Sequence, residues 1–202
     1  MNSRESGVAV VINDMIKGGL ERRDDPHHNA LVRASGVIDK TRQLVDSARA
    51  AGVPVIWIRV ERRPDRRDIV DNATDRPMGW HLPTVVSADT WEAEQVSALP
   101  VLDSDQVVLK PRLDPFQGTD LDLQLRAHGV RTILLGGHST NMGVESCART
   151  GHDLGYDVVV VRDCCFNASE KLHRFSLEEI LPFFSLVLSL DEVVSRFLPE
   201  LA

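Results

Sequence analysis

The chain has 202 residues, of which 43% are hydrophobic and 26% are charged, and this is the composition of an ordinary globular protein. Such a length suits one folding unit, so we expect a single domain over residues 1–202. The 23 basic and 30 acidic side chains give a net charge of −7. This excess of acids disfavours a nucleic-acid partner, because binding to nucleic acids depends mainly on basic groups.

The beginning of the chain and its cysteines indicate a location. A polar stretch, Met1–Gly7, precedes only a short apolar run, Val8–Ile12, so neither a signal peptide nor a membrane helix of ~18 residues is predicted. The three cysteines, Cys147, Cys164 and Cys165, do not have the pattern of a disulfide framework. We therefore expect a cytoplasmic protein that has no membrane partner.

Short apolar runs alternate with helical patterns along the chain. The predicted strands are Val8–Asn13, Val53–Val60, Gln106–Lys110, Thr132–Gly137, Asp157–Val161 and Phe184–Leu188. The predicted helices are Ser35–Ala51, Thr90–Leu99, Thr119–His128, Asn141–Leu154, Ser169–Ile180 and Asp191–Phe197. Strands that are apolar on both faces predict an α/β fold, in which helices cover both sides of a mostly parallel sheet.

Ligands of such sheets bind beyond the carboxyl ends of the strands. We therefore look for a site just after Asn13, Val60, Lys110 and Gly137. Asp14 follows the first strand and Lys110 ends the third, and a buried charge is costly unless it is paired or used. The turn 137–143 is rich in small residues and precedes a helix, so its backbone N–H groups suit an anion. Each feature alone has an ordinary structural explanation, but together they predict a site.

The segment Arg59–Arg76 holds six arginines and five acids. One interpretation is a solvated surface loop. The other is that Arg62 and Arg66 reach the cleft and bind a substrate carboxylate through two parallel hydrogen bonds.

These motifs together resemble the isochorismatase-like hydrolase superfamily, and the likeness extends from about Val8 to Val194. The family's first-strand acid matches Asp14. Its lysine, which precedes a Phe-x-Gly-Thr-x-Leu stretch, matches Lys110. Its turn Gly-x-x-Thr-Asn-x-Cys-Val-Glu-Ser-x-Ala-Arg matches Gly137–Arg149, and its downstream histidine matches His173. The resemblance implies a three-layer α/β/α fold with a six-stranded parallel sheet, and a non-proline cis peptide at His138–Ser139.

The main departure from this pattern is Gly143, which stands where the amidohydrolase members carry their nucleophilic cysteine. Some family members, the true isochorismatases, also carry glycine there, and they cleave a vinyl ether without a covalent intermediate. The resemblance therefore implies Asp14 as general acid, Lys110 as its electrostatic partner and Gly143 as open space with a usable N–H. We expect the substrate to be a small carboxylated metabolite, with His138, Ser139 and Met142 among its binding residues.

Other interpretations stay open. One alternative is an amide or ester hydrolase that uses activated water or a relocated thiol such as Cys147. Another is a non-catalytic binding protein that kept the fold. We expect no cofactor and no metal, for which Glu61 and His81 are the nearest candidates. The resemblance also implies a homodimer or homotetramer.

Overall fold

A computed structural model describes residues 7–65, 67–68 and 86–198 of the chain. Six strands form one parallel sheet in the order β3-β2-β1-β4-β5-β6. They are β1 (Val8–Asn13), β2 (Val55–Val60), β3 (Gln106–Lys110), β4 (Thr132–His138), β5 (Asp157–Phe166) and β6 (Leu186–Leu188). The predicted α/β fold with a six-stranded parallel sheet is confirmed.

Helices connect the strands. The α-helices are α1 (Lys17–Leu20), α2 (Pro26–Ser35), α3 (Val37–Ala50), α4 (Leu121–Ala127), α5 (Glu145–Asp153), α6 (Glu170–Phe175) and α7 (Leu190–Phe197). Two 3-10 turns are η1 (Trp91–Ala93) and η4 (Leu181–Phe183), and two π-helical turns are η2 (Thr140–Val144) and η3 (Ser176–Ile180). Helix α2 was not predicted, although the Asp25 side chain caps it and Pro26 is its first residue.

The helix predicted at Thr90–Leu99 is wrong beyond its first turn. Only Trp91–Ala93 is helical. After that turn the chain runs alongside the segment that follows β1: Glu94 accepts a hydrogen bond from the Lys17 N–H, and the Val96 N–H donates to Met15. These pairings with a distant segment replace the local hydrogen bonds that a helix would have made.

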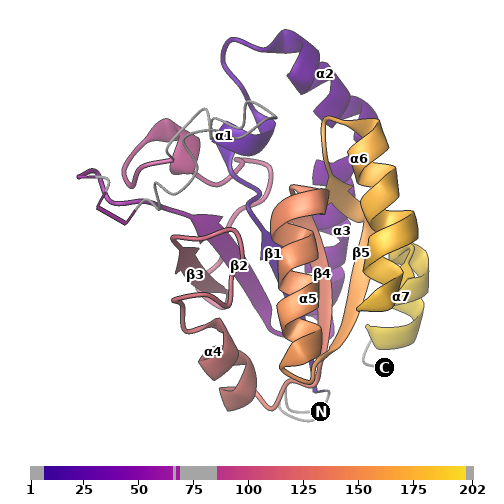
Figure 1. The fold of residues 1–202 in the computed structure, drawn as a ribbon. Helices are drawn as coiled ribbons and strands as arrows, with labels where there is room; N and C mark the ends of the chain where they lie inside the picture. The colour runs from indigo at the N-terminus through magenta and orange to yellow at the C-terminus, as the bar shows by residue number, and fades with distance from the viewer. Residues whose placement is uncertain (1–6, 66, 69–85, 199–202) are drawn as a thin grey trace.

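The sheet lies between two layers of helices (Figure 1). On one face, Val10, Ile12 and Trp57 pack in a core with Leu44 of α3 and Val193 of α7. On the other face, the alternate strand residues form a second core with α4 and α5, among them Val11, Ile58, Leu121, Leu125 and Ala148. Because both faces of β1 are covered, all six of its residues are buried. Among the described residues, no helix is long and apolar enough to cross a membrane.

Candidate active site

Asp14 and Lys110 form an ion pair at the carboxyl edge of the sheet. Asp14 follows β1 and Lys110 is the last residue of β3, and the Lys110 Nζ lies 2.6 Å from the Asp14 Oδ2. The lysine side chain is 1% exposed, whereas the aspartate side chain keeps 14% of its surface exposed. The ammonium also donates to the Leu113 carbonyl at 2.9 Å. The predicted meeting of these two side chains is therefore found, and Asp14 is the member of the pair that meets solvent.

The Asp14 carboxylate is held by the neighbouring strand as well. Its Oδ1 accepts a 2.8 Å hydrogen bond from the Val60 N–H at the end of β2, and its backbone adopts a φ of 50°. Burial raises the pKa of Asp14 above its ordinary value, although Lys110 and the Val60 N–H both act to lower that pKa. The site thus favours the protonated carboxyl more than water does.

Asn13 is a site residue that was not predicted. Its side chain is completely buried. The Oδ1 accepts from the Lys110 Nζ at 2.9 Å, while the Nδ2 donates to the Asp14 Oδ2 at 3.2 Å and to the His138 carbonyl at 3.0 Å. An asparagine at the end of an otherwise apolar strand was the available signal, because a buried carboxamide must find partners.

The open space expected at Gly143 is absent, and this expectation is wrong. A Cβ built on Gly143 would lie 2.0 Å from the Asn13 Nδ2 and 3.1 Å from the Lys110 Nζ. The Asn13 carboxamide therefore occupies the volume that a side chain at position 143 would need. Gly143 lies in the π-helical turn η2, which places its backbone beside the side chains of Asn13 and Lys110.

The turn between β4 and η2 carries the cis peptide at His138–Ser139, as the resemblance implied. The Ser139 Oγ accepts a 2.6 Å hydrogen bond from Asn167, and the Met142 N–H donates to the Ser139 carbonyl. The pKa of His138 is lowered to about 4, mainly by burial, and the nearby His28, Arg22 and Lys110 act in the same direction. His138 is therefore neutral at pH 7.

His173 also reaches this turn. Its Nδ1 lies 2.8 Å from the Oγ1 of Thr140, which is fully buried. This contact joins α6 to η2, and it gives the predicted downstream histidine a place beside the turn. Burial lowers the pKa of His173 below its ordinary value.

The three thiols lie in the cores. Cys147 is 1% exposed on α5, and Cys164 and Cys165 are buried in β5. Burial raises the pKa of all three, that of Cys165 to about 12. Since the thiolate is the nucleophilic form, none of the three has the environment of a reactive cysteine.

The arginine segment is described only in part. Arg62 is nearly buried, and its Nη1 donates to the Pro111 carbonyl at 3.2 Å, just after β3. It therefore lies at the expected edge of the sheet. Arg66 falls outside the described residues, as does His81. Glu61, the other metal candidate, forms an ion pair with Arg59 at 3.2 Å. Within the described ranges, no group of three or more histidine, cysteine, aspartate or glutamate side chains could hold a metal.

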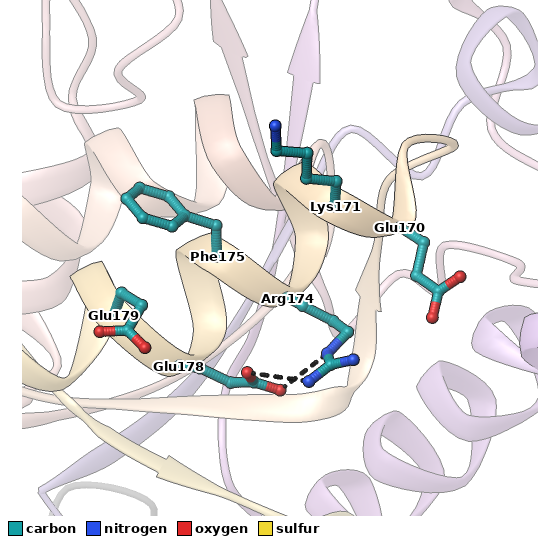
Figure 2. A pocket seen from close by; sticks show the side chains of 6 residues that line it. All are labelled: Glu170, Lys171, Arg174, Phe175, Glu178 and Glu179. Carbon is teal, nitrogen blue, oxygen red and sulfur yellow. Dashed lines mark hydrogen bonds and ion pairs between the residues drawn. The ribbon is translucent and has the colours of Figure 1, made fainter.

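A hollow elsewhere on the surface does not contain the predicted site residues. Figure 2 shows that its lining comes from α6 and the turn η3, with Phe175 between charged neighbours. All six lining residues are exposed. Arg174 and Glu178 form an ion pair at 3.0 Å along the helix. This stripe is the outer face of the helical segment whose inner side carries His173.

Comparison with known proteins identifies the family of this chain. The model of the isochorismatase domain matches residues 8–192. The chain belongs to the isochorismatase family. An uncharacterized isochorismatase-family protein of Escherichia coli O157:H7, YecD, is 35% identical over 187 residues, which cover 93% of this chain and 94% of that protein.

Other isochorismatase-family proteins have named activities or solved structures. A ureidoacrylate amidohydrolase, RutB of Methylorubrum extorquens, is 34% identical over 172 residues, covering 77% of this chain and 68% of that enzyme. A solved isochorismatase-family structure from Burkholderia thailandensis has a TM-score of 0.81 and 33% identity, with 95% of each chain covered. The protein is thus a hydrolase of the isochorismatase family.

Proposed function

We propose that this hydrolase acts without a covalent thiol, and that it cleaves the vinyl ether of a small carboxylated metabolite of the isochorismate type. Asp14 is the general acid and Lys110 is its electrostatic partner. The observation that carries this proposal is the cluster of Asp14, Asn13 and Lys110, in which the carboxyl group alone keeps appreciable exposure and has a raised pKa. Asp14 is therefore the group that substrate and water can reach.

The reaction would begin with a proton. The Asp14 carboxyl transfers its proton to the terminal vinyl carbon, which leaves an oxocarbenium centre at the carbon bonded to the ether oxygen. Water adds to that centre and returns one proton to the Asp14 carboxylate. The resulting hemiketal collapses to pyruvate and an alcohol, so that one water is consumed and the acid is regenerated.

Deuterium labelling tests the reaction type. Isochorismate is incubated with the protein in deuterium oxide, and the pyruvate is examined at early times. Protonation of the vinyl carbon puts one deuteron into the methyl group, which amide hydrolysis does not do. Asp14→Asn abolishes this product, whereas Asp103→Asn, at an exposed position, retains it. Release of pyruvate at an equal rate by the Asp14 variant would refute the proposal.

A second candidate is supported by the relatives. The similar RutB protein is a ureidoacrylate amidohydrolase, so amide hydrolysis by activated water is the alternative for this chain. In that reaction an ionised Asp14 would accept a proton from water. The two candidates require opposite protonation states of one carboxyl group, and the pH dependence of turnover separates them.

A further inference from the structure

We propose that Asn13 is the residue that commits this site to thiol-free hydrolysis: its carboxamide takes the place of a side chain at position 143 and holds Lys110 against Asp14. The catalytic part of this inference rests on the proposed function. Its steric part stands on the structure of the site alone.

Two glycines surround Asn13. A Cβ on Gly137 would lie 2.1 Å from the Asn13 backbone oxygen, and one on Gly143 would lie 2.0 Å from its side-chain Nδ2. Both distances are far below van der Waals contact. The backbone of Asn13 is fixed in β1 by its register opposite Gly137 and Ile58, so relief at position 143 must come from the Asn13 side chain.

That side chain is not free to rotate away. Its Nδ2 faces two acceptors, the Asp14 carboxylate and the His138 carbonyl, and its Oδ1 faces the Lys110 ammonium. This arrangement also fixes the orientation of the carboxamide, because exchange of its oxygen and nitrogen would place like groups together. Any β-carbon at position 143 therefore has to break contacts with Lys110, Asp14 and the cis-peptide turn.

Asn13 is a positioning residue, because it is completely buried and acts through its two charged neighbours. The amide N–H donor of Asn13 stabilises the carboxylate form of Asp14, while its amide oxygen accepts a hydrogen bond from the Lys110 ammonium. Truncation of Asn13 removes a donor from Asp14 and also leaves Lys110 with one acceptor fewer. We expect the pH at which Asp14 titrates to change, which a residue that only filled space would not cause.

A double-mutant cycle tests the steric part without any substrate. Gly143→Ala should lower the melting temperature by roughly 3–10 °C, because overpacking of a buried site is destabilising. In the Asn13→Ala background, the same Gly143→Ala change should cost less than half as much. Equal costs in the two backgrounds, or a Gly143→Ala variant as stable as the wild type, would overturn the inference.

A thiol probe tests the same point chemically. In Asn13→Ala/Gly143→Cys, the new Cβ lies about 3 Å from the Lys110 Nζ by the geometry above, and a nearby ammonium favours the thiolate. The thiolate should displace iodide from iodoacetamide at least tenfold faster than any thiol of Asn13→Ala, whose three cysteines are buried. A Gly143→Cys variant that labels equally fast without the Asn13 change would contradict the proposal. Should Gly143→Cys alone fail to fold, rescue by Asn13→Ala or Asn13→Ser supports it.

The catalytic part has its own readout. Asn13→Ser and Asn13→Ala should shift the pH profile of turnover, whereas unchanged profiles in both would refute the positioning role. If the cycle and the labelling behave as expected while no vinyl ether is hydrolysed, the proposed function fails and the steric inference survives.

Discussion

The Lys110 Nζ lies 2.6 Å from the Asp14 Oδ2, at a point where three neighbouring strands end. The lysine is buried and the aspartate is largely buried, so each charge is stabilised by its partner more than by water. Removal of one partner from such a pair leaves an uncompensated charge in a poorly solvated place. The ion pair is consequently sensitive both to substitution and to pH.

Lys110→Met should lower the free energy of unfolding by about 3 kcal/mol at pH 8, the usual cost of breaking a buried pair. The cost should be smaller at pH 5. Loss of the ammonium raises the pKa of Asp14 further, so the carboxyl group accepts a proton more readily as the pH falls. Urea unfolding at both pH values measures the effect. Lys171→Met, at an exposed position of α6, is the control and should change stability by no more than about 0.5 kcal/mol.

The pH dependence of kcat/KM should show which protonation state of Asp14 is the reactive one. If Asp14 is the general acid, kcat/KM falls as the pH rises through its raised pKa, because the reactive form is the protonated one. Lys110→Met should move this decline to higher pH in whatever activity it retains. A rate that instead grows with pH through the same range would identify Asp14 as a base and favour amide hydrolysis.

Because of His138, the folding stability should decrease as the pH is lowered. Its pKa is about 4 in the folded protein and near 6.5 when unfolded. Between these values the unfolded chain binds more protons, so stability is full above pH 6.5 and is lost as the pH falls toward 4. His138→Gln should flatten the measured curve in this window, and His27→Gln, at an exposed position, should leave it unchanged. A curve unaffected by His138→Gln would disprove this assignment.

Gly137→Ala should prevent folding or cost more than about 4 kcal/mol. Its φ is +129°, and the added Cβ would lie 2.1 Å from the Asn13 carbonyl oxygen, with neither strand able to move. Gly52→Ala is the matched control. Gly52 also has a positive φ, of +66°, but nothing lies within 4 Å of the added Cβ, so we expect a loss of only about 1–2 kcal/mol. Circular dichroism during thermal unfolding compares the two variants.

Much of the fold follows from local pattern. Val8–Asn13 and Gln106–Lys110 were predicted with their observed bounds, because strands buried on both faces are continuous apolar runs between turns. β5 is longer than predicted, and extends to Phe166, since its end pairs with β4 beyond a shift in register. That pairing depends on a partner strand and is not visible in the local sequence. The helix expected at Thr90–Leu99 failed for the same reason.

The charged residues of the site could be predicted from the sequence, but the lack of space beside Gly143 could not. Asp14 and Lys110 are charged residues at the ends of apolar runs, and the fold rule for parallel sheets brings such ends together. Whether Gly143 leaves a space depends on the direction of one neighbouring side chain, that of Asn13. No spacing or composition reports such a direction, because it is decided by the hydrogen-bond partners that the finished fold supplies.

Hydrolysis by this protein should depend on Asp14 and on no thiol. The most direct test measures the turnover of isochorismate, and of ureidoacrylate as the amide comparison, by the wild type, by Asp14→Asn and by a variant with Cys147, Cys164 and Cys165 all changed to alanine. We predict that the cysteine-free variant, if folded by circular dichroism, keeps kcat/KM within about threefold on the vinyl ether, and that Asp14→Asn loses at least a hundredfold, as loss of a general acid does. Turnover that disappears with the thiols, or that survives the loss of the Asp14 carboxyl group, would contradict the account.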